Sequence, residues 1–577
     1  MNYRLLTENH TSPLLDRLLS VRGVFEEHES FLNPTLSENR GDSFNLNDMD
    51  KGTDILIQAM KDRKSICIFG DYDVDGVTSS YLMYLLLSQY LKYPKVKIMY
   101  PDRLKDGYGM KIHHVDTMKA AGHDLIITVD NGITSIQEMI HAKNLGMQVI
   151  ITDHHKALEI IPEADAVINP QISNNYEFKG LCGAGVVFKF THALLKKSTL
   201  SPEQQQSIMN HFLPIVSIAT VADCVPLLGE NRAIVKRGLA QMTRRKYILP
   251  SLDGLLDFVN ISGPLKSFHI GFVIGPRINA GGRLATGYDS LKTLLFTGEK
   301  QIEALKNLDT INDERKKLQK DALELCLEQI DVQQSILIAT DPSFHEGIVG
   351  IVAGRITEKY NKPSIVLHIS SEKNIAVGSL RGPDHFDVMK MMQRIQTQSY
   401  GKGKESDKGI LIRFGGHKQA GGLSIHLDDL GILKQLAQDY ASSTITAQQE
   451  KKQINVDTIL HAHEWNETTL KPLDQMEPFG KSNEEPIFAL QNTLIKGVET
   501  VGTRGKGHLK ITLNHEGKHI EALYRSKGDR GEEFSLGSQI DIIGKVKFDH
   551  YKQQHYIDGT LLDNEENPDL INEEESE

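Results

Sequence analysis

The sequence contains little cysteine, and this scarcity argues against a disulfide framework. Only four cysteines occur among 577 residues, and none forms a C-x-x-C pair. Cys67, Cys182, Cys224 and Cys326 are widely spaced along the chain, which is typical of reduced, mostly buried thiols in a cytoplasmic protein.

Long apolar runs are also missing. The most apolar long segment spans residues 212–228, is shorter than a comfortable membrane span, and contains Asp223 and two prolines. We therefore expect no transmembrane helix. The N-terminus has no basic region followed by an apolar core, so we expect no secretory signal either.

A positive net charge, which many nucleic-acid-binding proteins carry, is absent as well, because the formal net charge is −11. Residues 563–577 hold eight acids and no base, and removing these eight negative charges from −11 leaves −3. The remaining chain is therefore near neutral and is compatible with a local basic groove. We expect the acidic tail to be a disordered, solvated end.

What the sequence does contain, between residues 65 and 170, is an alternation of strand and helix patterns. Helical stretches at 79–91 and 135–146 separate several apolar runs of strand length. These runs lie at 65–70, 96–101, 124–130, 148–153 and 164–169. The alternation predicts βαβ units and a parallel sheet, in which ligands bind beyond the carboxyl ends of the strands.

Acids and histidines follow several of these strands. Asp71, Asp73 and Asp75 come after the first strand. Asp130 follows the third strand, and the Asp-His-His run at 153–155 follows the fourth. Because the carboxyl ends of parallel strands meet at one edge of a sheet, we expect these side chains to lie close together.

The stretch GDYDVDG (70–76) places three acids at alternating positions before a glycine. An EF-hand calcium loop needs an acid at its twelfth position and a helix before it, but Leu82 occupies that position and an apolar strand precedes the stretch. A helix dipole would explain one acid at this place. Three acids so close together repel one another unless a cation is present, which favours a metal site.

The stretch ITDHHK (151–156) supports the same interpretation. A lone histidine is more often a core residue, but here Asp153, His154 and His155 adjoin at the edge that carries four more acids. Mixed carboxylate and imidazole ligands suit Mn²⁺ and related divalent ions. Asp223 lies in another apolar setting and is either a further ligand or a structural acid.

This set of candidate ligands is larger than one ion needs. Two ions about 3.5–4 Å apart are the usual arrangement for hydrolysis of phosphoesters and phosphoanhydrides. The residues by themselves therefore predict a two-metal phosphoryl hydrolase without naming its substrate.

Three glycine-rich motifs in the rest of the chain favour phosphate contact. GSLRGP (378–383) offers Ser379 and Arg381, and FGGHKQAGG (414–422) places His417 in a flexible loop. GPRINAGGR, at 275–283, supplies Arg277 and Arg283. Each motif alone is equally explained by glycine turns and by arginines that cap helices or form ion pairs. Together with a metal cluster they favour binding of substrate phosphate.

Beyond the first α/β region, the patterns predict three further parts. Residues 290–330 are charged and helical in period, and form one helix or two. A second α/β segment begins at 335 and ends near 445. Short strand patterns and turns over 487–562 suit a small β-barrel such as an OB-fold.

These motifs, taken in order, resemble the DHH phosphoesterase superfamily and, within it, the bacterial single-strand-specific exonucleases. The resemblance covers the chain from about residue 30 to 562. It is carried by GDYDVDGVTS, YPDRLKDGYG (100–109), TVDNGI (128–133), ITDHH, LCGAGVVFK (181–189), TVADCVPL (220–227), GPRINAGGRL, FHEGIVGIVAGRI (344–356), GSLRGP, RFGGHKQAGG and PFGKSNEEPIF (478–488).

The resemblance implies a role for each candidate site residue. It implies metal ligation by six residues, with Asp130 as the bridge between two ions: Asp71, Asp73, Asp75, Asp130, His154 and Asp223. It implies that His155 contacts the scissile phosphate and that His417 belongs to a phosphate-binding loop. It implies that a pocket for the 5′ phosphate of the strand is formed by Arg103, Arg277, Ser379 and Arg381.

The resemblance also implies the architecture. The fold class is α/β, with a parallel-sheet DHH domain joined by a long helix to a second α/β, DHH-associated domain, and an all-β OB-fold at the C-terminus. We expect an N-terminal extension at 1–50, the DHH catalytic domain at 51–289, the connecting helix at 290–332, the DHH-associated domain at 333–446, the OB-fold domain at 447–562 and the tail at 563–577. Basic residues at 503–513 and 545–556 of the OB-fold would bind the strand. Tyr551 and Tyr556 are either base-stacking residues or ordinary barrel packing.

The activity implied by the resemblance is 5′-to-3′ hydrolysis of single-stranded DNA to 5′ mononucleotides, in recombination and repair. The implied cofactor is a pair of Mn²⁺ ions, with Mg²⁺ as the alternative. The implied partners are single-stranded DNA, a single-strand-binding protein and a RecQ-type helicase, for a cytoplasmic monomer without membrane contact. Two rivals stay open: a DHH-family phosphodiesterase for short oligonucleotides or cyclic dinucleotides, and a non-catalytic DNA-binding scaffold.

Overall fold

The computed structural model describes residues 3–7, 11–26, 28–39, 41–103, 105–403, 408–446, 449, 453–502 and 507–560. The chain divides into two compact units. Unit 1 comprises residues 1–21, 314–472 and 486–577, and unit 2 comprises residues 22–313 and 473–485. The acidic tail expected at 563–577 lies outside the described residues, as do Arg504 and Lys506 of the expected basic stretch.

Unit 2 is built on a parallel sheet of five strands in the order β3-β2-β4-β5-β6. Its strands are β2 Ile66–Phe69, β3 Val96–Met99, β4 Leu125–Val129, β5 Gln148–Thr152 and β6 Ala166–Ile168. Each strand lies within one of the ranges predicted from the sequence. Most residues of the three central strands, β2, β4 and β5, are apolar and buried, as in an α/β sheet that is covered on both faces.

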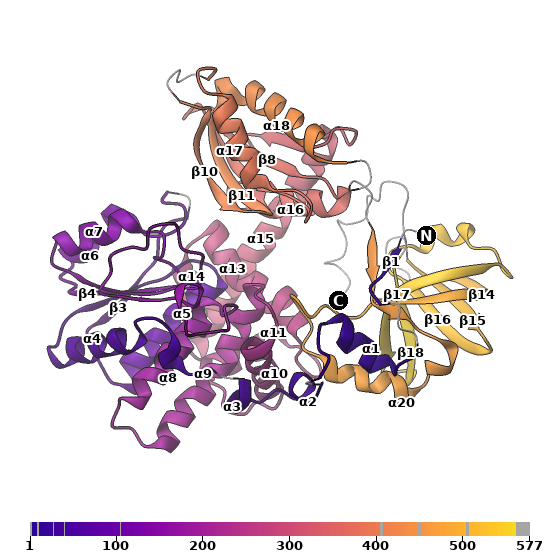
Figure 1. The fold of residues 1–577 in the computed structure, drawn as a ribbon, viewed down its shortest axis with the longest axis horizontal. Coiled ribbons are helices and arrows are strands. Elements are labelled where there is room, and N and C mark those ends of the chain that lie inside the picture. The colour runs from indigo at the N-terminus through magenta and orange to yellow at the C-terminus, as the bar shows by residue number, and fades with distance from the viewer. Residues whose placement is uncertain are drawn as a thin grey trace. The chain divides into compact units, whose positions relative to one another are not determined.

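Helices cover both faces of this sheet (Figure 1). Ile66 and Ile68 of β2 point into the larger core together with residues of α4, α5 and α8, whereas Cys67 and Phe69 point into a second core with residues of α6 and α7. The helices of this layer are α4 Met49–Lys61, α5 Val74–Leu85, α6 Ile112–Ala120, α7 Ile136–Asn144 and α8 Gly183–Lys196.

The rest of unit 2 is helical. Its helices are α2 His28–Leu32, α3 Leu36–Asn39, α9 Pro202–Ala222, α10 Gly229–Thr243, α11 Pro250–Val259, α12 Ser267–His269, α13 Gly275–Leu284, α14 Gly287–Leu295 and the first half of α15 Glu299–Gln329. The charged region expected to be one helix or two is therefore two helices, α14 and α15. Two π-helical turns, η2 Leu86–Tyr90 and η4 Ile270–Ile274, interrupt this regular pattern.

The first part of unit 1 is a mixed sheet in the order β10-β11-β9-β8-β7, in which only β7 and β8 pair in parallel. Its strands are β7 Leu337–Asp341, β8 Ser364–Ser370, β9 Ile375–Arg381, β10 Leu411–His417 and β11 Ala420–His426. The helices are α16 Val349–Tyr360, α17 Val388–Gln398 and α18 Leu430–Thr444. Apolar residues of α17 and α18 form the core against the sheet.

The second part of unit 1 is a β-barrel. Its strands are β13 Thr458–Ile459, β14 Phe488–Val501, β15 His508–His515, β16 Lys518–Tyr524, β17 Gln539–Asp549 and β18 Gln554–Gly559. Pairing of β14 with β17 closes the ring β14-β15-β16-β18-β17, with β16 and β18 parallel. This is the five-stranded Greek-key barrel of an OB-fold, as predicted.

The N-terminal residues of the chain join this barrel region. Strand β1 (Tyr3–Leu5) pairs in parallel with β12 (Ile454–Val456). Arg17, in α1 (Leu14–Val21), is buried and donates to Glu464 Oε2 at 2.9 Å and to the Ile459 carbonyl at 3.0 Å. Helix α20 (Glu467–Leu470) follows in the same region. Tyr3–Leu5 and Arg17 are thus structural partners of residues more than 400 positions later.

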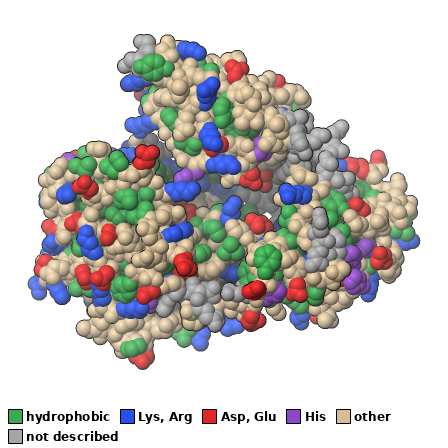
Figure 2. Space-filling model, viewed as in Figure 1, with side chains coloured by type: hydrophobic (Ala, Val, Ile, Leu, Met, Phe, Trp, Pro, Cys, Tyr) green, Lys and Arg blue, Asp and Glu red, His purple; other side chains and the backbone are tan. Residues whose placement is uncertain are grey.

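Acidic and basic side chains are interspersed over the face of the molecule shown in Figure 2. None of the described helices combines the length and the apolarity that crossing a membrane requires. The four cysteines are free thiols, and three of them are buried while Cys224 is exposed. The burial of three cysteines agrees with the expectation of mostly buried thiols.

Candidate metal centre

The predicted metal ligands lie at the carboxyl edge of the parallel sheet in unit 2. Asp71 follows β2, Asp130 directly follows β4, and His154 comes shortly after β5. Strands β2, β4 and β5 are neighbours and run in parallel, so their ends meet at one edge. Asp75 lies in the first turn of α5, and Asp223 caps the C-terminus of α9.

Backbone amides fix two of the acids. Asp73 is the N-cap of α5, and its Oδ1 accepts the Gly76 amide at 3.0 Å. Asp75 accepts amides from the start of α8, from Gly183 at 2.5 Å and from Ala184 at 2.8 Å. The positive end of the α8 dipole therefore supports the Asp75 carboxylate.

The side chains form three overlapping groups whose ligand atoms lie within 4.8 Å of one another. The groups are Asp71, Asp73 and Asp130; Asp75, His154 and Asp223; and Asp130, His154 and His155. The Nε2 atom of His154 lies 3.1 Å from Asp130 Oδ1, 3.6 Å from Asp223 Oδ2 and 3.7 Å from Asp75 Oδ2. All six predicted ligands are brought together, and Asp130 is shared between groups.

Several buried atoms of this cluster have no hydrogen-bond partner among the described residues. They are Asp71 Oδ1, Asp130 Oδ1, His154 Nε2 and Asp223 Oδ2. An unsatisfied buried polar atom costs about 1–3 kcal/mol, and more if it is charged. Divalent cations bound by carboxylate oxygens and an imidazole nitrogen would satisfy these atoms, so the residues fit a metal centre.

The backbone around Asp130 has two features that bring the start of α8 close to its carboxylate. Asp130 has a left-handed conformation, with φ of 60°. An added Cβ at Gly183 would lie 2.5 Å from Asp130 Cβ and 2.7 Å from Asp130 Oδ1. Only glycine therefore lets α8 begin this close to the Asp130 carboxylate.

The electrostatics of the cluster favour cation binding. Burial, with the charge of Asp73 added, raises the pKa of Asp71 to about 8. Burial and the neighbouring acids also raise the pKa values of Asp73, Asp130 and Asp223. Burial lowers the pKa of His154, which keeps its imidazole neutral and able to ligate a metal. Without a cation, the ionised acids would repel one another.

Asp153 organises the histidines instead of joining the groups of ligand atoms. Its carboxylate accepts the amides of Ile133 at 2.9 Å, His154 at 2.7 Å and His155 at 3.1 Å, and it lies 2.8 Å from His155 Nδ1. Burial by itself would lower the pKa of His155, but the hydrogen bond and charge of Asp153 raise it to about 9. Asp153 therefore favours the cationic form of His155 at the edge of the cluster when no metal is bound.

Sequence reasoning assigned no role to Tyr108 or to Asn279. The Tyr108 hydroxyl lies 3.2 Å from His155 Nδ1 and 3.4 Å from the Asp130 carbonyl oxygen. Asn279 Oδ1 accepts the Val74 amide, at the start of α5, at 3.1 Å. Both lie in motifs that carried the resemblance, but only the fold shows what they contact.

The predicted phosphate-binding arginines of unit 2 have different surroundings. The Arg103 guanidinium lies 5.1 Å from the centre of the Tyr72 ring, between Asp71 and Asp73 in sequence. Arg277, on α13, donates to Asp309 Oδ1 at 2.7 Å and to the Val273 carbonyl at 2.8 Å. Arg103 is thus placed beside the metal-binding loop, whereas Arg277 is ion-paired to α15.

The remaining predicted phosphate contacts belong to unit 1. Arg381, at the end of β9, donates to Ser379 Oγ at 2.6 Å, and Ser379 Oγ donates to the Gly421 carbonyl at 3.1 Å. The expectation of a flexible loop around His417 is wrong. His417 ends β10 and pairs with Ala420 across a tight hairpin to β11. Its glycines allow close strand approach, since a Cβ at Gly416 would collide with the Ala420 carbonyl oxygen.

A second acid–histidine group in unit 2 consists of Asp106, His113 and His114. His114 Nδ1 accepts the Lys111 amide at 3.0 Å, and its Nε2 lies 3.0 Å from Asp106 Oδ2. Asp106 also accepts the Asp102 amide at 2.9 Å, and its other oxygen lies 3.2 Å from His113 Nε2. These contacts form a hydrogen-bonded network that closes the turn carrying Arg103.

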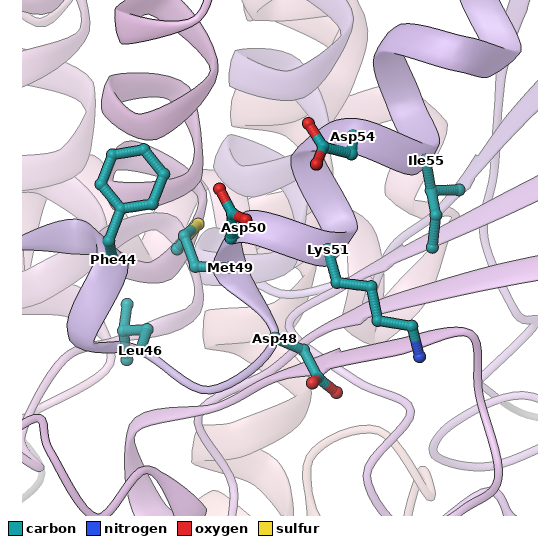
Figure 3. Close-up of a pocket in the computed structure, with 8 residues that line it drawn as sticks. All are labelled: Phe44, Leu46, Asp48, Met49, Asp50, Lys51, Asp54 and Ile55. Atoms are coloured by element: carbon teal, nitrogen blue, oxygen red, sulfur yellow. The ribbon is translucent and has the colours of Figure 1, made fainter.

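A shallow hollow of about 510 Å³ lies at the start of α4 and is lined by the residues labelled in Figure 3. It shares no lining residue with the metal centre. Its acids already have partners, because Lys197 Nζ lies 2.6 Å from Asp50 Oδ1 and 2.6 Å from Asp54 Oδ1, and Asp48 accepts the Val167 amide. This hollow therefore shows no sign of a second ligand site.

Comparison with known proteins agrees with this fold and site. Family models match residues 65–220 (DHH family, N-terminal domain), 333–443 (DHHA1 domain) and 456–563 (RecJ OB domain). The sheet, its edge of acids and histidines, and these matches define a DHH-family protein with a divalent-metal site. Within that class, the chain belongs to the RecJ family.

The relatives cover most of the chain. The single-stranded-DNA-specific exonuclease RecJ of Bacillus subtilis (strain 168) is 31% identical over 562 residues, covering 95% of this chain and 67% of the relative. The enzyme of the same description from Escherichia coli (strain K12) is 31% identical over 527 residues, covering 88% and 87%. The crystal structure of RecJ in complex with Mn²⁺ from Thermus thermophilus matches with a TM-score of 0.78 at 25% identity, covering 95% of this chain and 75% of that one.

Proposed function

We propose that this protein is a metal-dependent exonuclease that is specific for single-stranded DNA and acts in recombination and repair. One observation of the structure carries the proposal: six candidate ligands converge at one sheet edge with buried atoms that lack hydrogen-bond partners. The relatives at 31% identity are named for the same activity. The OB-fold barrel supports a nucleic-acid substrate.

The finer proposal concerns the cofactor and the reaction. The cofactor is a pair of Mn²⁺ ions, with Mg²⁺ as the alternative, held by Asp71, Asp73, Asp75, Asp130, His154 and Asp223. The six ligands fall into two groups of three, Asp71, Asp73 and Asp130, and Asp75, His154 and Asp223, and this division supports two ions rather than one. Such a pair of ions supplies an activated water and stabilises negative charge on the phosphate. The proposed product is a 5′ mononucleotide, released in the 5′-to-3′ direction.

The chain's own residues are proposed to position the substrate. His155 binds the scissile phosphate, and Asp153, hydrogen-bonded to its Nδ1, keeps the ring oriented. Arg103, Arg277, Ser379 and Arg381 bind the terminal 5′ phosphate, and His417 contributes a further phosphate contact. Arginine suits this task because its planar donors match phosphate oxygens.

The proposal extends to the domains and to the protein's surroundings. The boundaries predicted from the sequence remain our division: 1–50, 51–289, 290–332, 333–446, 447–562 and 563–577. The OB-fold binds the incoming strand, and Tyr551 is a stacking candidate because its side chain is 97% exposed. We place the protein in the cytoplasm as a monomer, with a single-strand-binding protein and a RecQ-type helicase as partners.

The alternative is a phosphodiesterase for short oligonucleotides or cyclic dinucleotides, which would share the metal centre. The barrel favours the longer substrate, because a dinucleotide has no strand for it to bind. A non-catalytic scaffold is disfavoured because none of the candidate ligands is missing from the cluster.

The first experiment follows the degradation of long single-stranded DNA, labelled at either end, with Mn²⁺ present. We expect immediate release of labelled mononucleotide from the 5′ end, and none from blunt duplex. Asp130→Ala should abolish release, whereas Asp253→Ala, which removes an exposed acid paired with Arg245, should not. Cleavage confined to dinucleotides would select the short-substrate alternative, and no cleavage by the folded, metal-supplied protein would select the scaffold.

A further inference from the structure

The segment Leu473–Glu485, here called the strap, lies within the range expected for the OB-fold domain but groups with unit 2. The chain enters it from residue 472 and leaves it at residue 486, both of which are in unit 1. The strap contains most of the PFGKSNEEPIF motif. The proposed chemistry gives this motif no task.

Arg232, on α10, holds the first half of the strap. Only 1% of Arg232 is exposed, and its guanidinium donates to the carbonyls of Gln475 at 3.3 Å, Glu477 at 3.1 Å and Pro478 at 3.4 Å. The same guanidinium donates to the Phe31 carbonyl at 2.6 Å and lies 4.0 Å from the centre of the Phe31 ring. One buried cation therefore determines the path of several strap residues.

The second half of the strap is a tight turn. Gly480 and Asn483 exchange backbone hydrogen bonds of 2.9 and 3.1 Å. The buried Asn483 side chain donates to the carbonyls of Met476 and Pro478, each at 2.9 Å. Ser267, at the start of α12, donates to the Phe479 carbonyl at 2.5 Å. The turn is thus rigid and presents Gly480 and Lys481 in fixed positions.

Those two residues contact the loop that follows Asp223. The Leu227 amide donates to the Lys481 carbonyl at 2.8 Å. A Cβ at Gly480 would lie 2.7 Å from Leu227 Cδ1, so the Leu227 side chain would have to shift to admit it. Leu227 itself is buried, which leaves its side chain little room to move away.

The same loop is also hydrogen-bonded to α10. Asn231 donates to the Pro226 carbonyl at 3.0 Å and to the Gly180 carbonyl at 2.5 Å. Gly180 shortly precedes the start of α8, whose amides hold Asp75. Asp223 therefore begins a loop of a few residues that is fixed between the strap and α10.

We infer that the strap is a positioning element of the metal centre: through Leu227 it holds the loop that places Asp223 beside His154. This inference rests on the proposed metal centre and assigns a task to Gly480 and Arg232, neither of which touches the ligand. Functional groups must be held within about 0.5 Å of the productive geometry, and supporting residues provide that precision. Substitution of outer-shell partners typically costs about 10–100-fold in metal affinity.

The test measures binding of Mn²⁺ by titration calorimetry in the full chain, without DNA. Gly480→Ala should weaken binding about tenfold, because its Cβ displaces Leu227. Arg232→Lys should weaken it to a similar extent, because the single nitrogen of lysine lacks the planar, spread-out donors with which the guanidinium reaches the strap carbonyls. The double variant Gly480→Ala, Leu227→Ala should restore affinity to within about threefold of wild type, since it frees the space that the added Cβ needs.

The matched control is Arg17→Lys, which changes another 1%-exposed arginine, in unit 1. It should lower thermal stability without changing the dissociation constant for Mn²⁺. Folded strap variants that bind Mn²⁺ as tightly as wild type would overturn the inference, as would a double variant that is no better than Gly480→Ala. Strap-dependent Mn²⁺ binding in a protein that hydrolyses no DNA would uphold the inference and refute the exonuclease proposal. A wild-type protein that binds no Mn²⁺ would refute both.

Discussion

Asp106, His113 and His114 lie as close to one another as the acids and histidines at the ends of β2, β4 and β5. The two groups differ in how their polar atoms are satisfied. In the second group, His114 Nδ1 accepts a backbone amide, so its proton lies on Nε2 and faces Asp106. A metal at that Nε2 would need the other tautomer, which the Lys111 amide opposes.

In the cluster of predicted metal ligands at the strand ends, by contrast, several polar atoms are not satisfied. Four buried ligand atoms of that cluster lack a hydrogen-bond partner among the described residues, and most of its acids have raised pKa values. Proximity of acids and histidines is therefore a poor criterion for a metal site by itself. Unmet hydrogen bonds and mutual repulsion distinguish a site that needs a cation from a network that is complete without one.

The two groups should differ most in how much Mn²⁺ affinity is lost when one acid is replaced. Asp223→Asn keeps the size of the side chain and removes a ligand charge, so Mn²⁺ affinity and hydrolysis of single-stranded DNA should each fall by at least about 100-fold. Asp106→Asn should leave Mn²⁺ affinity within about threefold of wild type. Calorimetry of both purified variants makes the comparison, and equal losses would mean that the two groups are not distinct.

A smaller effect is expected from removal of the metal. At a free Mn²⁺ concentration of 100 times the dissociation constant, binding should stabilise the fold by about 2.7 kcal/mol. Chelation with EDTA should reverse this gain and lower Tm. In thermal scans, Mn²⁺ should raise the Tm of His113→Ala as much as that of wild type, whereas it should not raise the Tm of Asp130→Ala. If His113→Ala lost a large part of the rise, the second group would itself bind the ion.

The smallest effect concerns pH in the metal-free protein. The pKa of Asp71, raised by burial to about 8, exceeds that of an unfolded aspartate, about 3.9. Its stabilising contribution is complete below the unfolded value and is lost as pH rises towards about 8. Asp106 has the opposite sign: burial opposes the shift, but hydrogen bonds from the Asp102 amide and His114 lower its pKa. Its contribution is present above the unfolded value and is lost as pH falls through the folded one.

Urea unfolding of EDTA-treated protein between about pH 5 and pH 8 measures this difference. Wild type should lose stability over the range, because the cluster acids stay protonated in the folded state while the same acids are already ionised in the unfolded chain. Asp71→Asn should lose less stability than wild type over this pH range, and Asp106→Asn should lose as much as wild type. A flat profile for wild type would mean that these acids are not destabilised by burial in the absence of metal.

The sequence predicted the parts of the site that depend on local pattern. The strands of unit 2 fall inside the predicted ranges, and the acids that follow them converge because parallel strands end together. Asp153 was expected to be a supporting acid, and its hydrogen bonds to the amides of His154 and His155 agree with that role. Membership of the RecJ family, expected from the order of the motifs, is confirmed by the relatives.

Other features depend on contacts between distant residues or on backbone geometry. Asn279 reaches the Val74 amide across more than 200 positions, and Leu227 meets Lys481 across an even longer separation. The pattern of apolar residues along the chain does not indicate contacts between residues so far apart. The glycines around His417 were interpreted as a loop, because glycine that permits close strand pairing and glycine that permits a turn look the same in sequence.

The path of the strap has a practical consequence for dissecting this protein. A truncation before residue 447, chosen to remove the OB-fold domain, would also remove Leu473–Glu485 and the carbonyls that Arg232 binds. It would leave a buried guanidinium without most of its acceptors, and β1 without its partner strand β12. Loss of activity in such a fragment would therefore say nothing about DNA binding by the barrel. A cleaner dissection replaces residues 487–560 with a short linker and keeps the strap, β12 and the N-terminal residues.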